Sequence, residues 1–220
     1  MKLLSKARGD VLECGVGTGL NLPGYLSTNA VDQIHTLTGI DISDGMLRQA
    51  RARANDIGLV ARLSENTKVA TATTSQQAND TDTDQRDLTG DSRNPQVGPL
   101  RLVQADVARL PFEKNTFDSV VDTFSVCVFP DPEAALQEMA RVTKPGGRLL
   151  LLEHVRSSNR LFGWYQDTTN SAVSAMSKGC SWNQDVRAMV EALPGVKVLD
   201  SENAVGGLVQ LLQAEKVNTE

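Results

Sequence analysis

The fold is decided by residues 11–19, which read VLECGVGTG. The first part of this stretch is apolar, as in a buried strand, and the second part places glycine at every second position, at Gly15, Gly17 and Gly19. Glycine permits a tight turn from a strand into a helix and lets a ligand approach the backbone closely. The following helix offers free N–H groups to a negatively charged ligand group. A dinucleotide fingerprint would place its third glycine at position 20, which is Leu20, so the spacing argues against a nicotinamide dinucleotide.

Short apolar runs alternate with helical patterns on both sides of this turn. The predicted strands are Val11–Val16, Ile34–Ile42, Arg101–Ala105, Asp118–Phe124, Arg148–Val155, Val196–Ser201 and Leu208–Gln213. The predicted helices are a crossover helix after Gly19, a helix from Asp44 to about Ile57, one that starts at Asp131-Pro132-Glu133 and ends at Lys144-Pro145-Gly146-Gly147, and one near Asn183–Ala192. This alternation predicts an α/β fold with a parallel sheet that is covered on both faces.

The composition indicates one globular domain, residues 1–220, with a low-complexity insertion. The chain has 220 residues, 40% of them apolar, and a net charge of −5. Residues 64–99 contain seven threonines and no aromatic residue, and they supply −3 of that charge. Such a stretch is typical of a disordered insertion, and a regulatory loop is the alternative interpretation. The absence of a basic face argues against a nucleic-acid partner.

The rest of the sequence predicts a soluble intracellular chain without a metal site. No apolar run approaches the ~18 residues of a membrane span, and residues 1–10 contain no signal-peptide core. Cys14, Cys127 and Cys180 are odd in number and far apart. They fit neither a disulfide framework nor a zinc ligand pair, which indicates a reducing compartment such as the cytoplasm.

Three acids stand at the ends of the first three predicted strands, and these ends line one crevice in a parallel sheet. Glu13 lies two residues before the first glycine, where it would repel phosphates but attract a cationic amine or sulfonium. Asp41 can accept hydrogen bonds from two ribose hydroxyls, and Asp106 can accept one from an exocyclic amino group such as that of adenine. Taken singly, Asp41 or Asp106 could instead be a helix N-cap, and Glu13 a solvated edge residue.

These motifs, in order, resemble those of class I S-adenosylmethionine-dependent methyltransferases, and the branch that includes the quinone-biosynthesis methyltransferases is the most similar. The resemblance covers roughly Val11–Val155. Its motifs are Glu-x-Gly-x-Gly-x-Gly at 13–19, Gly-Ile-Asp at 39–41, Ala-Asp-Val-x-x-Leu-Pro-Phe at 105–112, Phe-Asp-Ser-Val-Val at 117–121 and Lys-Pro-Gly-Gly-Arg-Leu-Leu at 144–150.

The resemblance implies a Rossmann-like sheet of seven strands in the order 3-2-1-4-5-7-6, with Leu208–Gln213 antiparallel. It also implies S-adenosylmethionine as the cofactor. Glu13, Gly15 and Gly17 would then meet the methionine end of the cofactor, Asp41 the ribose, and Asp106 with Val107 the adenine. The further residues expected to bind the cofactor are Thr18, Gly19, Ile42, Met46 and Phe124.

A shorter resemblance links Glu153-His154-Val155 and residues 178–183, KGCSWN, to the Oms-type mitochondrial methyltransferase-like proteins. It adds the mitochondrion as a second expected location. Class I enzymes usually carry helices before the first strand that close over the cofactor, whereas only about ten residues precede Val11 here. From this we expect a shortened chain, a chain that has lost activity, or a protein partner that supplies the lid.

The expected reaction is methyl transfer to a small or lipid-like acceptor, and the alternative is a non-catalytic cofactor-binding scaffold protein. His154 is the candidate general base, because it follows the fifth strand at the carboxyl end; a structural histidine is the alternative. The residues expected to line the acceptor pocket are Cys127, Phe162, Trp164 and Tyr165, with core packing as the alternative.

Overall fold

The computed structural model describes residues 2–27, 30–64, 99–177 and 179–217. Nearly all of the predicted insertion at 64–99, together with Lys178, lies outside these described residues. The prediction about the insertion is therefore not tested by the structure.

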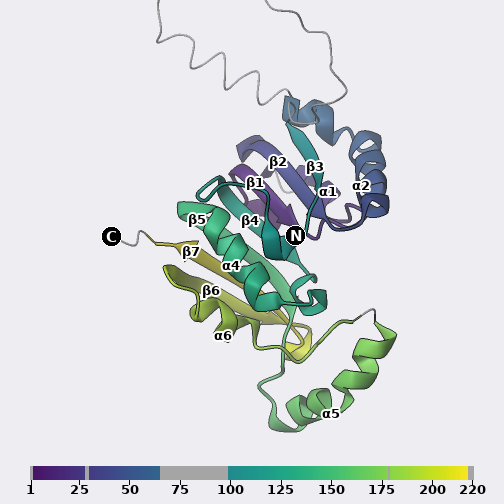
Figure 1. The fold of residues 1–220 in the computed structure, drawn as a ribbon, viewed down its shortest axis with the longest axis vertical. Helices are drawn as coiled ribbons and strands as arrows, with labels where there is room; N and C mark the ends of the chain where they lie inside the picture. Colours follow the sequence, from purple (N-terminus) through teal and green to yellow (C-terminus); the bar gives the residue numbers. More distant parts are fainter. Residues whose placement is uncertain (1, 28–29, 65–98, 178, 218–220) are drawn as a thin grey trace, which may run out of the picture.

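Seven strands form one sheet in the order β3-β2-β1-β4-β5-β7-β6 (Figure 1). Neighbouring strands are parallel except for β7, which runs antiparallel to both β5 and β6. The strands are β1 (Gly9–Cys14), β2 (Ile34–Asp41), β3 (Leu100–Gln104), β4 (Phe117–Thr123), β5 (Thr143–His154), β6 (Val196–Ala204) and β7 (Val209–Lys216). The expected fold class and strand order are thus confirmed.

The α-helices are α1 (Leu22–Ser27), α2 (Asp44–Asp56), α4 (Pro132–Val142), α5 (Arg160–Met176) and α6 (Val186–Glu191). Short 3-10 helices are η1 (Leu4–Lys6), η2 (Ala30–Gln33), η4 (Val107–Arg109), η5 (Val126–Val128) and η6 (Val205–Gly207). Side chains cap three of the predicted helices: Ser43 accepts a hydrogen bond from the Met46 N–H, Asp131 from the Ala134 N–H, and Asp185 from the Ala188 N–H. Capping of this kind satisfies the free N–H groups of a first helical turn.

Helices cover both faces of the sheet, because the central strands are apolar on both sides. On β4, Val120 packs in the core that contains α4 and α6, while its neighbour Val121 packs in the core that contains α1 and α2. Leu149 and Leu150 of β5 divide in the same way. Successive residues of a strand point to opposite faces, so a strand buried on both sides reads as a continuous apolar run.

The structure corrects three details of the predicted elements. Pairing of β5 with β4 already starts at Thr143, and Lys144–Gly147 form an irregularity in the register before Arg148. The crossover after Gly19 is the short helix α1 followed by η2, because Pro23 and Gly24 do not support a long helix. The segment after Val155, for which no element was predicted, contains the 17-residue helix α5.

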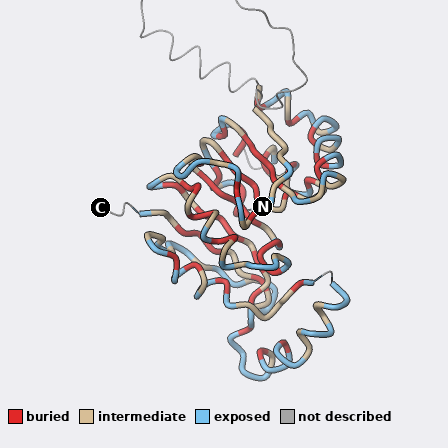
Figure 2. Tube along the Cα trace, viewed as in Figure 1, coloured by how far each residue is buried: buried red, intermediate tan, exposed pale blue. Residues whose placement is uncertain are grey.

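Helix α5 lies at one end of the molecule, beyond the strands, and is exposed along most of its length (Figures 1 and 2). Its buried residues are Gly163 and Gln166. The Gln166 side chain accepts from the Ser157 N–H at 2.7 Å and donates to the carbonyls of Val155 and Trp182. These hydrogen bonds fasten the helix to the segments on either side of it. Within the described ranges, no helix is both long and apolar enough to cross a membrane.

Candidate functional site

A cleft of about 550 Å³ opens at the carboxyl ends of β1 to β4, on the edge where the sequence places its acids and glycines. Eight of the residues expected to bind the cofactor line it: Gly15, Gly17, Asp41, Ile42, Met46, Asp106, Val107 and Phe124. Further lining residues, which the sequence analysis did not identify, are Ser43, Ala105, Thr123, Ser125, Val128, Phe129 and Pro130. Glu13, Thr18 and Gly19 do not belong to the lining.

The three glycines of the first turn have positive φ angles but different surroundings. A Cβ at Gly15 would come within 2.3 Å of the Ser125 hydroxyl, and a Cβ at Gly19 within 2.7 Å of a Leu22 methyl group. A Cβ at Gly17 would meet only a backbone oxygen at 3.9 Å. Gly15 and Gly19 therefore allow close packing within the protein, whereas Gly17 leaves open space in the wall of the cleft.

The Asp41 carboxylate is held in place at the end of β2. Its Oδ2 accepts a hydrogen bond from the Gly17 N–H at 3.0 Å, and its Oδ1 accepts one from the Ser43 N–H at 2.8 Å. A carboxylate offers about four acceptor positions, so two remain for a ligand. The fixed carboxylate is suited to accept from two neighbouring hydroxyl groups.

Asp106 has both of the roles that its position in the sequence suggested. It is the N-cap of η4, with Oδ1 accepting from the Ala108 N–H at 2.9 Å, and it also lines the cleft. The cap interaction uses one acceptor position and fixes the side chain at the edge of the cleft. A cap role and a ligand role are thus compatible at this residue.

Glu13 is buried, which excludes the alternative that it is a solvated edge residue. Its Oε1 accepts from the Asn21 amide at 3.0 Å, and the same amide donates to the Thr123 hydroxyl at 2.6 Å. Its Oε2 is buried without a hydrogen-bond partner. Burial raises the pKa of Glu13 to about 7, against the effect of the neighbouring Asn21. Asn21, which connects Glu13 to the cleft residue Thr123, was not predicted from the sequence.

Two further buried acids, Asp122 and Glu153, lie behind Ser125 at the ends of β4 and β5. The Ser125 N–H donates to both carboxyl groups, to Asp122 Oδ1 and to Glu153 Oε1, each at 3.3 Å. Burial raises the pKa of Asp122 to about 6, against the effect of its hydrogen bonds with Glu153 and the Ser125 N–H. Burial and the neighbouring Asp122 raise the pKa of Glu153 well above its usual range. A cationic ligand group near these acids would favour their ionised forms.

Phe124 is held in the left-handed region of the backbone, at φ 57°, and it is 40% exposed in the cleft wall. Non-glycine residues seldom adopt positive φ, and such strain gathers at functional sites. Its ring packs against the His154 ring, with centroids 4.8 Å apart and planes tilted by 43°. His154 itself is not in the lining of the cleft, and burial lowers its pKa, which favours the neutral imidazole.

The surroundings of the His154 Nδ1 atom were not anticipated: it lies 3.8 Å from the sulfur of Cys127 and 3.8 Å from that of Cys180. The two sulfur atoms are 3.0 Å apart. Cys127 is buried and outside the lining of the cleft. Burial raises the pKa of its thiol. Two of the three cysteines, far apart in the sequence, therefore meet at one histidine.

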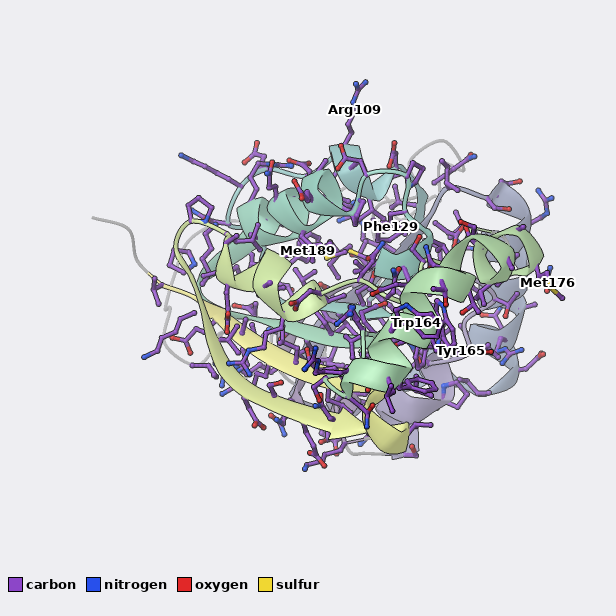
Figure 3. All side chains as sticks on the ribbon, turned by 90° about the horizontal axis from the view of Figure 1, so that it is seen from below. Arg109, Phe129, Trp164, Tyr165, Met176 and Met189 are labelled. Atoms are coloured by element: carbon purple, nitrogen blue, oxygen red, sulfur yellow. The ribbon has the colours of Figure 1, made fainter. Side chains whose placement is uncertain are left out.

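The aromatic residues of α5 do not line the cofactor cleft either. Phe162 and Tyr165 pack against Trp182, with each ring centroid 6.2 Å from that of Trp182. Trp164 projects from the same helix and is 65% exposed (Figure 3). After the helix, the Ser181 N–H donates to the Cys127 carbonyl at 2.7 Å, which connects the end of α5 to η5 beside the cleft.

Comparisons with known proteins identify methyltransferases as relatives of the chain. Residues 66–151 match a family model described as a methyltransferase domain. The chain is 31% identical over 211 residues to phosphatidylethanolamine N-methyltransferase of Cereibacter sphaeroides, covering 94% of this chain and 80% of that protein. It is 33% identical over 138 residues to the ubiquinone/menaquinone biosynthesis C-methyltransferase UbiE of Idiomarina loihiensis, covering 54% of this chain and 55% of that one.

Among solved structures, the YcgJ protein of Bacillus subtilis superimposes with a TM-score of 0.64 at 16% identity. The superposition covers 98% of this chain and 95% of the other. This likeness supports the fold alone. The proteins compared here are bacterial, so they give no support to the expected mitochondrial location.

Proposed function

The chain belongs to the class I S-adenosylmethionine-dependent methyltransferases, and we propose that it transfers the methyl group of its cofactor to a lipid-like acceptor at the cleft formed by β1 to β4. The cofactor is S-adenosylmethionine and the chain is an enzyme. A non-catalytic scaffold is therefore not the favoured alternative. The place of the cofactor in the cleft and the class of acceptor are the parts that we propose.

The wall of the cleft fits the parts of this cofactor. Gly17 leaves room for a ligand beside the turn, and the Asp41 carboxylate is fixed where it can accept from two ribose hydroxyls. Ile42 is 70% exposed in the cleft, although it is a large apolar residue, and a planar base would cover it. Asp106 supplies an acceptor for an exocyclic amino group at the same end.

The acidic side of the cleft fits the cationic end of the cofactor. Glu13 keeps one buried carboxylate oxygen without a partner, and a cationic group that enters the cleft would favour the ionised forms of Glu13 and of Asp122 and Glu153 behind Ser125. When bound, S-adenosylmethionine supplies a methyl carbon that its positive sulfur activates for in-line displacement by a nucleophile. The protein then has to hold and orient the two reactants, which accounts for the largest rate gains in such reactions.

An apolar acceptor is favoured by the apolar part of the cleft lining. Phe124, Val128 and Phe129 present apolar surface there, and Phe124 and Val128 are each 40% exposed. Apolar surface of this kind would be covered by an apolar acceptor. The names of the two relatives given above refer to quinone biosynthesis and to a phospholipid, which agrees with a lipid-like acceptor.

The need for a base depends on the acceptor. An amine that arrives unprotonated attacks without one, whereas a carbon or oxygen acid has to lose a proton. His154 stays our candidate base for that case, because its neutral form can take up a proton and its ring contacts Phe124, which lines the cleft.

The experiment is a transfer assay with S-adenosylmethionine that carries a labelled methyl group. The acceptors are a demethylated quinol and phosphatidylethanolamine in mixed micelles, with a water-soluble catechol as the polar control. We expect label in the organic extract with one of the two lipids, and inhibition by S-adenosylhomocysteine. Transfer to the catechol alone would contradict the proposed acceptor class.

A further inference from the structure

Three side chains that can bind a metal ion converge beside the cofactor cleft. Cys127 comes from η5, His154 from the end of β5, and Cys180 from the loop after α5. The sulfur atoms lie 3.0 Å apart, and each is 3.8 Å from His154 Nδ1. Among the described residues, these three form a group whose possible ligand atoms all lie within 4.8 Å of one another.

The distances are close to those of a bound ion. Zinc bonds of about 2.3 Å to sulfur and about 2.0 Å to nitrogen, at tetrahedral angles, separate sulfur from nitrogen by roughly 3.5 Å and the two sulfurs by roughly 3.8 Å. Both sulfur–nitrogen distances are therefore near the value required. The two thiols would have to move apart by roughly 0.8 Å, a small rearrangement of side chains.

The surroundings fix all three ligands. The Ser181 N–H donates to the Cys127 carbonyl at 2.7 Å and thereby holds the loop that carries Cys180. The Phe124 ring supports one face of the His154 imidazole. Ligands that are already oriented lose less entropy when an ion binds.

Two buried acids lie near the site. The carboxyl groups of Asp122 and Glu153 are close enough to act on the Cys127 thiol electrostatically, and with burial they raise its pKa. A free thiolate, which is the form that attacks in disulfide exchange, is therefore disfavoured. A bound divalent ion would favour the ionised forms of the thiols and of these acids.

We propose that Cys127, His154 and Cys180 form a binding site for a thiophilic divalent cation, zinc being the ion that this donor set suits best. On binding, each thiol loses its proton to solvent and the neutral imidazole donates a lone pair, so that two protons leave for each ion bound. The ion would join the loop after α5 to η5 beside the wall of the cleft. This inference concerns residues outside the lining of the cleft. With an ion bound at Nδ1, the His154 ring holds its proton on Nε2, so His154 can act as the base only in the metal-free chain.

Metal content of the full chain, purified under a phosphine reductant, tests the proposal. We expect about one zinc ion per chain, and none in Cys127→Ser or Cys180→Ser. His154→Ala should weaken zinc binding at least about tenfold, since even loss of an outer partner of a ligand costs that much. Cys14→Ala is the matched control: Cys14 is buried like the others but lies outside the cluster, so zinc should be retained.

Cobalt(II) added to the metal-free chain gives a second readout. We expect intense visible bands of tetrahedral cobalt and a near-ultraviolet thiolate-to-cobalt band, together with release of two protons per ion. Both bands should be lost in Cys127→Ser and retained in Cys14→Ala. Circular dichroism of each variant distinguishes loss of the site from loss of the fold.

Two outcomes would overturn the proposal. One is a reduced, folded chain that takes up neither zinc nor cobalt. The other is a chain whose mass is lower by two hydrogens because Cys127 and Cys180 form a disulfide, with no metal uptake after reduction. Neither outcome would affect the methyl-transfer assay, so a failure here is distinguishable from a failure of the proposed function.

Discussion

Gly17 and Asp41 show most clearly how single residues form the cofactor site. The N–H of Gly17 donates to Asp41 Oδ2, so the glycine turn and the end of β2 fix each other. The open space beside Gly17 is in the wall of the cleft, where a side chain would compete with a ligand.

Gly17→Val should abolish binding of S-adenosylmethionine. The valine would occupy the open space and would also be strained at φ 54°. Gly146→Val is the control for strain, because Gly146 has φ 75° and open space but lies in the irregular start of β5, away from the cleft. Isothermal titration calorimetry should find binding only in the control. Equal affinities in the two variants would show that the cofactor binds elsewhere.

Asp41→Ala should weaken cofactor binding by roughly 10- to 100-fold, because hydrogen bonds to a charged group contribute that much to affinity. Asp44→Ala, three residues along the chain at the exposed start of α2, is the control and should bind like the wild type. The same calorimetric titration measures both. An unchanged affinity in Asp41→Ala would exclude Asp41 from the ribose contact.

Glu13 should make stability depend on pH between about 4.5 and about 7. Burial raises the pKa of its carboxyl group to about 7, so within this range the folded chain keeps a proton that the unfolded chain has lost. The free energy of unfolding therefore falls as the pH rises through this range and levels off above it. Asp122 and Glu153 act in the same direction because burial raises their pKa values too.

Urea unfolding at a series of pH values measures this effect. The slope should be smaller in Glu13→Gln, which keeps the size of the side chain and its acceptor for Asn21. Glu113→Gln is the control, because Glu113 is exposed. A wild-type slope in Glu13→Gln would show that Glu13 does not carry the raised pKa.

Some residues of the site could be predicted from the sequence and others could not. Asp41 and Asp106 follow strands within recognisable motifs, so their place at the sheet edge is a local consequence of the chain. Cys127 and Cys180 are brought together by η5 and by the loop after α5, a juxtaposition that spacing does not indicate. Asn21 was missed for the same reason, since its partners Glu13 and Thr123 lie on different strands.

At the scale of elements, the strands were predictable because burial on both faces leaves continuous apolar runs. Helix α5 was not, because it packs little against the core: its buried residues are Gly163 and Gln166, while Leu161, Trp164 and Met176 are exposed. The start of β5 at Thr143 was missed because Pro145 and the two following glycines are typical of a turn.

The exposed aromatic residues of α5 should contribute to acceptor binding and not to cofactor binding. We expect the double variant Trp164→Ala/Tyr165→Ala to raise the KM for the lipid acceptor several-fold and to leave the Kd for S-adenosylmethionine unchanged, because neither side chain lines the cofactor cleft. Leu161→Ala is the control on the same helix, 82% exposed and outside the aromatic cluster. An unchanged KM for the acceptor in the double variant would show that α5 does not contribute to the acceptor site.

At the scale of the whole molecule, two cores on opposite faces of one sheet hold the cleft in place. Because α4 packs on one face and α2 on the other, the strand ends that carry Asp41 and Asp106 are fixed from both sides. The prediction that 64–99 is an insertion into a single domain concerns residues that the structure does not describe, apart from both ends, and it stays a prediction.

Replacing residues 66–97 with a flexible Gly-Ser linker of about ten residues tests that prediction. If the segment contributes nothing to the core, the melting temperature should change by only a few degrees, since loop length affects stability weakly. The affinity for S-adenosylmethionine should be unchanged. Loss of cooperative unfolding would show that the segment belongs to the folded domain.

Thermal unfolding of the whole chain with three ligands tests the central claim, that the cleft at the ends of β1 to β4 binds S-adenosylmethionine. We predict that S-adenosylmethionine and S-adenosylhomocysteine each raise the melting temperature, that NAD does not, and that Gly17→Val abolishes both shifts. Stabilisation by NAD alone, or shifts that persist in Gly17→Val, would contradict the account.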